Sequence, residues 1–151
     1  MEAARAFDRP GLTRLAYVDG PLRADEAVIL EAEGFTPVLR PEADLGGQLE
    51  HAFFRAFRFG ARRVVAVCAG HAEVTPEILA EAFDALREDD AAIGPSEDGG
   101  YYLIGLSRPC RQVFRGIAWG SDRVLFETLA RLRACGYNLR ILPPRLSGAR
   151  A

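Results

Sequence analysis

The chain has 151 residues, 49% of them hydrophobic and 26% charged, so it is long enough for one well-buried core and too short for two ordinary domains. Its formal net charge of -2 provides no basic surface for nucleic acid or for an anionic membrane. We therefore predict one domain over residues 1–151, with 1–11 as an N-terminal extension and 145–151 as a frayed tail, and no nucleic-acid partner.

The basic and sulfur-containing residues exclude further classes. All 19 basic residues are Arg, which excludes a Schiff-base lysine and a P-loop lysine. The three cysteines, Cys68, Cys110 and Cys135, form neither a disulfide framework nor a closely spaced metal knuckle. The start of the chain has no apolar signal segment, and no apolar run reaches the length of a membrane span. We expect a soluble, cytoplasmic protein without a membrane partner.

Strand-like and helical patterns alternate along the first half of the chain. The pattern predicts strands over 12–18, 35–40 and 63–68, a short helix over 23–32, and a longer helix from 44 or 45 to 59. In the longer helix, apolar residues such as Leu45, Leu49 and Phe53 recur at spacings of three and four, and Gly60 is placed to end it.

The second half continues the alternation. Thr75-Pro76-Glu77 combines a hydroxyl cap, a proline in the first turn and an acid near the positive helix end, which predicts a helix to about Arg87. Strands are predicted to end at Ile93 and to cover 101–106 and 139–142, with a helix from Ser121 to Gly136 between the last two. The central strand over 63–68 is apolar on both faces, so we predict an α/β fold with a mixed, largely parallel sheet flanked by helices.

The most informative stretch joins two of these strands. It places Asp98 and the adjacent Gly99 and Gly100 between an apolar strand end at Gly94-Pro95 and the strand over 101–106. Ligands of open α/β sheets bind beyond the carboxyl ends of the strands, where the loop over 68–71 is also expected. A second glycine leaves bare backbone N–H groups beside the carboxylate, which suits a polar ligand. The alternative is a hairpin turn without a ligand. We predict that Asp98 lies at a concave surface, with its carboxylate within hydrogen-bond reach of Gly99, Gly100 or nearby backbone N–H groups.

Four other residues are candidates for a functional or a structural role. Trp119 would stack on a sugar or base, or would pack a crossover loop. Tyr101 and Tyr102 alternate faces of a strand, so one is expected in the core and the other toward the crevice or solvent. Asp44 alone is interpreted as a helix cap.

The hairpin carries a resemblance. Gly94-Pro95 followed by residues 98–106 resembles the signature of DUF2064, a bacterial family of glycosyltransferase-like proteins related to GT-A nucleotide-diphospho-sugar transferases. Asp44-Leu45-Gly46 resembles the family's aspartate-leucine-glycine helix start, and residues 113–121 resemble its phenylalanine-to-tryptophan segment. The resemblance covers roughly residues 12–142.

The resemblance implies a GT-A-like three-layer sandwich that transfers a glycosyl or nucleotidyl group from a nucleotide-activated donor. In that role Asp98 would orient the acceptor or contact a metal, and Gly99, Gly100, Tyr101 and Trp119 would bind substrate. An active enzyme would use Mg²⁺ or Mn²⁺ to neutralise the leaving diphosphate. The alternative is a non-catalytic homologue that serves as a ligand-binding or oligomeric partner module.

The chain departs from the family pattern in two places. The family's first β-α unit, with its basic glycine-containing loop, is missing before residue 12, and Gly70 stands where a metal-binding aspartate is expected. His71 or Glu73 would be the substitutes, but the set is poor for a hard cation, so we predict no divalent ion at the 68–71 loop. The missing unit would leave the flank of the central strand open. We expect a homodimer to cover it, in preference to residues 1–11 folding back.

Overall fold

The computed structural model describes residues 12–18, 23–32, 34–39, 41–67 and 74–144. The predictions for residues 1–11, for the loop with Cys68, Gly70, His71 and Glu73, and for residues 145–151 lie outside the described residues. The elements are, in chain order, β1 (Arg14–Val18), α2 (Ala24–Ala32), β2 (Phe35–Leu39), α3 (Leu45–Arg58), β3 (Val64–Val67), α4 (Pro76–Ala85), β4 (Ala91–Pro95), β5 (Tyr101–Leu106), the 3-10 helix η1 (Arg111–Phe114), α5 (Val124–Ala134) and β6 (Leu139–Ile141).

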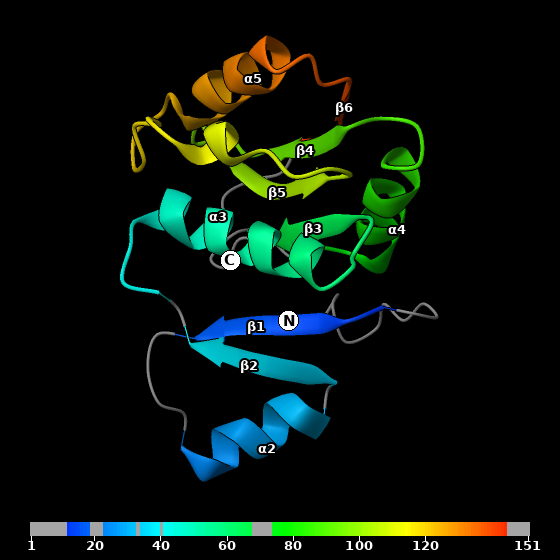
Figure 1. Ribbon diagram of the computed structural model, residues 1–151, viewed down its shortest axis with the longest axis vertical. Helices are drawn as coiled ribbons and strands as arrows, with labels where there is room; N and C mark the ends of the chain where they lie inside the picture. The colour runs from blue at the N-terminus through cyan, green and yellow to red at the C-terminus, as the bar shows by residue number, and fades with distance from the viewer. Residues whose placement is uncertain (1–11, 19–22, 33, 40, 68–73, 145–151) are drawn as a thin grey trace.

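The strands form two sheets that are flanked by helices (Figure 1). In the smaller sheet, β1 pairs in parallel with β2. The larger sheet has the order β3-β5-β4-β6, in which β5 is antiparallel to both of its neighbours and β6 is parallel to β4. The predicted α/β fold with mixed strand pairing between helices is confirmed.

The helix starts follow from their capping residues. The side chain of Asp44 accepts a hydrogen bond of 2.9 Å from the backbone N–H of Gly47, as expected of the cap of α3. Thr75 caps α4 in the same way, with its hydroxyl oxygen 3.2 Å from the N–H of Ile78 and Pro76 in the first turn. The start of α5 differs from the prediction, because Ser121 precedes a turn and the helix begins at Val124.

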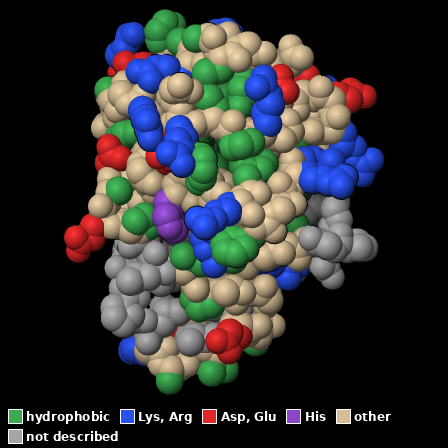
Figure 2. All heavy atoms as spheres, viewed as in Figure 1, with side chains coloured by type: hydrophobic (Ala, Val, Ile, Leu, Met, Phe, Trp, Pro, Cys, Tyr) green, Lys and Arg blue, Asp and Glu red, His purple; other side chains and the backbone are tan. Residues whose placement is uncertain are grey.

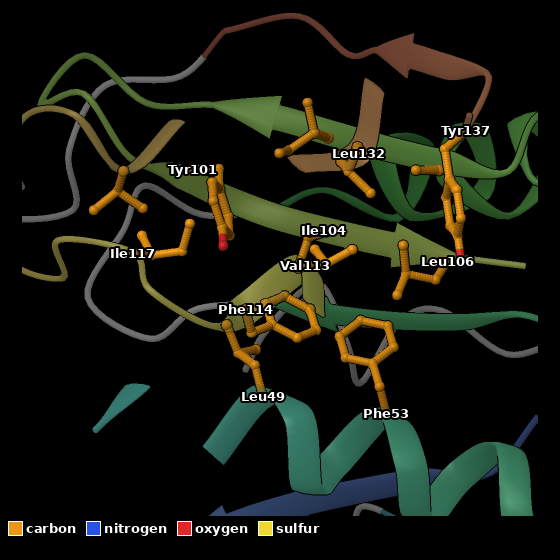
Figure 3. Close-up of a cluster of buried hydrophobic side chains, with 13 residues drawn as sticks. Leu49, Phe53, Tyr101, Ile104, Leu106, Val113, Phe114, Ile117, Leu132 and Tyr137 are labelled. Carbon is orange, nitrogen blue, oxygen red and sulfur yellow. The ribbon is translucent and has the colours of Figure 1, made fainter. Parts of the chain in front are cut away.

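The core covers both faces of the β4–β5 hairpin. Figure 3 shows Leu49 and Phe53 of α3 pointing toward Phe114 of η1, whose ring centroid lies 5.4 Å from that of Phe53. The cluster on this face contains buried residues from α3, β4, β5, η1 and α5. The opposite face packs on α4 through residues such as Ile78 and Leu79. Every side chain of β5 is therefore buried.

This burial corrects one expectation for the adjacent tyrosines. Tyr101 belongs to the buried cluster that packs on α3, and Tyr102 belongs to the one that packs on α4, so the two side chains do lie on opposite faces of the sheet. Neither faces a crevice or solvent, since they are only 3% and 0% exposed. The reason is that β5 is an interior strand with apolar layers on both sides, which the sequence of one strand does not reveal.

Each sheet ends in a strand without a pairing partner on its outer side. The strand over 63–68 was expected to be central and buried on both faces, but β3 is an edge strand of the larger sheet and its last residue, Val67, is exposed. Among the described residues no strand pairs with the outer side of β3 or of β1. Such edges carry backbone donors and acceptors that can pair with a further strand.

Candidate functional site

The β4–β5 turn lies at the carboxyl edge of the larger sheet. Val67 of β3 and Gly94 of β4 both pair with Leu103 of β5, so β3 and β4 run in the same direction on either side of β5 and end at the same edge (Figure 1). Asp98 lies in the connection between Pro95 and Tyr101, which pair with each other. The sequence prediction that Asp98 lies beyond the carboxyl ends of the strands is confirmed.

Hydrogen bonds fix the orientation of the Asp98 carboxylate. Its Oδ1 atom accepts from the hydroxyl of Ser96 at 2.6 Å and from the backbone N–H of Gly100 at 3.0 Å. The turn closes through a bond of 3.1 Å from the N–H of Ser96 to the carbonyl of Gly100. Ser96 is buried whereas Asp98 is exposed. A buried hydroxyl thus holds a surface carboxylate, and the predicted contact with backbone N–H groups is confirmed.

The two glycines have different tasks in this turn. The N–H of Gly99 donates to the carbonyl of Ser96 at 3.3 Å, and that of Gly100 donates to Asp98. Both N–H groups therefore bond inside the turn, which corrects the expectation that they are bare and point toward a ligand. Ligand contact by these glycines stays a prediction that rests on their lack of side chains.

Gly99 also allows the turn to contact the start of α5. Its φ of +86° is one that residues with a Cβ rarely adopt, and a Cβ there would collide with the backbone carbonyl of Asp122. The carbonyl of Gly99 accepts a hydrogen bond of 2.8 Å from the N–H of Leu125. The roles of Ser96 and Asp122 in this turn were not predicted from sequence, although Ser96 stands in a Ser-x-Asp pattern that is typical of such turns.

Trp119 packs on the start of α3. A Cβ at Gly46 would lie 2.9 Å from Cε2 of Trp119, and it would also meet the indole nitrogen and the carbonyl of Phe114. Gly46 and Trp119 belong to the two segments, Asp44-Leu45-Gly46 and residues 113–121, that supported the resemblance. Because Trp119 is half-buried and packs against Gly46 and the core cluster, the loop-packing interpretation is confirmed, and stacking on a ligand stays a prediction.

The loop that carries Trp119 is anchored by α5. The carboxylate of Glu127 accepts a bond of 2.8 Å from the N–H of Ala118, and the hydroxyl of Ser121 donates to the carbonyl of Ala118 at 2.6 Å. The first turn of α5 thus contacts both the Asp98 turn and the Trp119 loop. Tyr101 contacts α5 from the core side, where its hydroxyl accepts a hydrogen bond of 3.5 Å from the hydroxyl of buried Thr128. A direct contact of Tyr101 with substrate stays a prediction.

The described side chains do not form a metal site. No group of three or more His, Cys, Asp or Glu residues suitable for an ion occurs within the described ranges. The prediction of no divalent ion at the 68–71 loop concerns residues outside those ranges and stays a prediction. In the same part of the chain, no helix is long and apolar enough to cross a bilayer.

Comparison with known proteins identifies the family. The model of the DUF2064 family, described as "Uncharacterized protein conserved in bacteria", matches residues 3–121, so the chain belongs to this family. The fold is similar to the crystal structure of a "putative nucleotide-diphospho-sugar transferase" from Desulfovibrio desulfuricans G20, with a TM-score of 0.79 and 31% sequence identity. The similarity covers 92% of this chain and 62% of that one, so the chain spans less than two thirds of its length. No curated protein matches at a significant level. The chain is therefore a DUF2064 member whose fold is similar to that of this putative nucleotide-diphospho-sugar transferase.

Proposed function

We propose that this DUF2064 protein binds a nucleotide-activated sugar at the edge formed by the Asp98 turn and the Trp119 loop, and transfers a glycosyl or nucleotidyl group to an acceptor. The observation that carries the proposal is a surface carboxylate in a fixed orientation at the carboxyl edge of the sheet. The fold similarity to the D. desulfuricans protein supports the class of donor.

In this proposal Asp98 orients the acceptor. An acceptor hydroxyl would donate a hydrogen bond to the carboxylate, which would take up its proton as the new bond to the acceptor oxygen forms. The hydrogen bonds from Ser96 and Gly100 hold the carboxylate in one orientation, so it loses little conformational freedom when the acceptor binds. Trp119 packs against Gly46, and the exposed part of its ring would stack on a sugar or base.

An active enzyme would use Mg²⁺ or Mn²⁺ at the donor diphosphate, where one or two carboxylates together with the phosphates can hold such an ion. Within the described ranges, no group of three or more His, Cys, Asp or Glu residues could hold an ion by protein ligands alone. Binding experiments with and without Mn²⁺ would show whether the whole chain supplies them.

A non-catalytic partner module is the second candidate. The observation that favours it is the unpaired outer edges of β1 and β3, neither of which pairs with a further strand within the described part of the chain. A second copy of the chain would cover these backbone groups by adding to a sheet edge. This candidate includes the proposed homodimer, and it is compatible with a retained ligand site.

The test is calorimetry with a panel of nucleotide sugars, with and without Mn²⁺, followed by a transfer assay with any donor that binds. The variant Asp98→Asn keeps an Oδ1 acceptor for Ser96 and Gly100 but lacks the charge. The control is Glu97→Gln, the same change at the exposed neighbour of Asp98 in the turn.

We expect donor binding by all three proteins, and transfer by Asp98→Asn slower by about 10²–10⁴-fold while Glu97→Gln stays near the parent rate. Equal transfer rates in the two variants would contradict the role of Asp98. Donor binding without transfer by the parent protein would support the partner module, and no binding of any donor would contradict the proposed function itself.

A further inference from the structure

Two cysteines that are far apart in sequence lie together at the surface, away from the candidate site. Cys110 directly precedes η1 and Cys135 directly follows α5, so 25 positions separate them. Their Sγ atoms are 3.4 Å apart and share a hydrogen bond. Both thiols are free and half-buried. A disulfide has an S–S distance of about 2.05 Å, so the two sulfur atoms have to approach by only about 1.4 Å to form one.

The thiol pair is open to small molecules. It lines a surface groove of about 570 Å³, together with aromatic and basic residues that include Phe54, Arg108 and Arg111. Figure 2 shows basic side chains gathered on the upper part of this face, in the region of η1 and α5. A small oxidant in solution can therefore reach the sulfur atoms without an opening of the fold.

A network on either side holds the two thiols in place. The hydroxyl of Tyr137 donates to the carbonyl oxygens of Arg108 and Pro109, at 3.3 and 3.1 Å, and the guanidinium of Arg108 lies 3.9 Å from the centre of the Tyr137 ring. Burial raises the pKa of Tyr137 to about 12, so its hydroxyl stays a donor at neutral pH. Arg131 of α5 donates to the carbonyl of Gln112 at 3.2 Å and also bonds the carbonyl of Arg115. The segments that carry Cys110 and Cys135 are thus joined independently of the thiols.

The two thiols are not equivalent. The hydrogen bond with Cys110 and burial both raise the pKa of the Cys135 thiol, which disfavours its thiolate. Thiolates are the attacking species in thiol oxidation. This asymmetry makes Cys110 the first thiol to react and Cys135 the one that resolves the product.

We propose that Cys110 and Cys135 form a dithiol modification site that a peroxide converts into an intramolecular disulfide. The Cys110 thiolate attacks one peroxide oxygen, the O–O bond breaks, and the departing hydroxide takes a proton to leave as water. The resulting sulfenic acid is attacked by the sulfur of Cys135, the S–O bond breaks, and the second hydroxide leaves as water with the Cys135 proton. Two thiols are oxidised by two electrons and one peroxide is reduced to two waters.

The site is independent of the proposed transfer reaction, because no residue of the Asp98 turn takes part in it. Its product would join the end of α5 to the start of η1 by a covalent bond. The reverse step requires only a small dithiol reductant, since the pair stays at the surface groove.

The experiment uses the full chain with Cys68→Ser, so that Cys110 and Cys135 are the two remaining thiols. After treatment with one equivalent of hydrogen peroxide, denaturing mass spectrometry should show a single-chain mass lower by two hydrogens, with no free thiol left. Trypsin should release residues 88–111 linked to residues 134–140, and dithiothreitol should separate them. The bond should form at least about tenfold faster in the folded chain than in the chain unfolded by guanidinium, because folding holds the sulfurs together.

Single variants in the same background test the order of reaction. With Cys135→Ser, dimedone should trap a sulfenic acid on Cys110, whereas Cys110→Ser should label more slowly at Cys135. Equal labelling of the two variants would overturn the assigned order. Equal rates in folded and unfolded chains, or disulfide-linked dimers instead of the internal link, would overturn the proposed site.

Discussion

Replacing Gly99 by alanine tests whether the Asp98 turn depends on its contact with α5. The residue has a φ of +86°, and an L-residue in that region is less stable by about 1–2 kcal/mol. The added Cβ would also displace the carbonyl of Asp122 and weaken the 2.8 Å bond from Leu125 to Gly99, which contributes about 0.5–1.5 kcal/mol. With the strain of moving backbone, we expect Gly99→Ala to lower the free energy of unfolding by about 2–4 kcal/mol.

The matched control is Gly120→Ala. Gly120 has nearly the same φ, +85°, but a Cβ there would meet no atom within 4 Å. Both variants reduce the entropy of the unfolded chain equally, so the difference between them isolates the close approach to Asp122. Urea denaturation should place Gly99→Ala at least about 1 kcal/mol below Gly120→Ala. Equal losses in the two variants would refute the inference that this contact fixes the turn.

Three further predictions concern Asp98, Asp90 and the oligomeric state. Asp98→Ala should keep the fold and lower the free energy of unfolding by about 1–2 kcal/mol, with a smaller loss for Asp98→Asn; global unfolding of the alanine variant, seen by circular dichroism, would mean that the residue is structural. The pKa of Asp90 is lowered by a hydrogen bond from the N–H of Asn138 and by Arg108, so its stabilising effect is complete above the unfolded pKa and is lost as pH falls below about 4. Asp90→Asn should therefore reduce the acid dependence of stability in urea titrations, and an unchanged dependence would argue against this group. Sedimentation at micromolar concentration should give a homodimer, and a clean monomer of 16.5 kDa would exclude it.

The parts of the fold that were predictable from sequence are those fixed by local chemistry. The cap of α3 at Asp44 and the start of α4 at Thr75 depend on residues within one helical turn, and both are confirmed. The burial of Tyr102 was not predictable, because its hydroxyl reaches the carbonyl of Pro143, 41 positions away. A strand pattern indicates which side chains share a face, but it does not reveal that helices cover both faces.

The candidate site shows the same division. Asp98 was identified because an Asp-Gly-Gly turn between two strands has a recognisable local pattern. The contact between Gly99 and Asp122 was not, since it joins segments 23 residues apart, and neither was the pairing of Cys110 with Cys135. Odd cysteine counts and wide spacings give no pairing rule, so only the packing of α5 against η1 brings the sulfurs together.

The glycines of the family motifs have a common role in this fold. Gly46 allows Trp119 to lie against the start of α3, and Gly99 allows the Asp98 turn to lie against Asp122. In both places a side chain would separate two segments that are far apart in the sequence. The motif glycines therefore allow close tertiary contacts, and the position of Asp98 relative to Trp119 depends on both glycines. A ligand site assembled in this way is as precise as the packing of α5, since its first turn bonds to the Asp98 turn through Leu125 and to the Trp119 loop through Glu127.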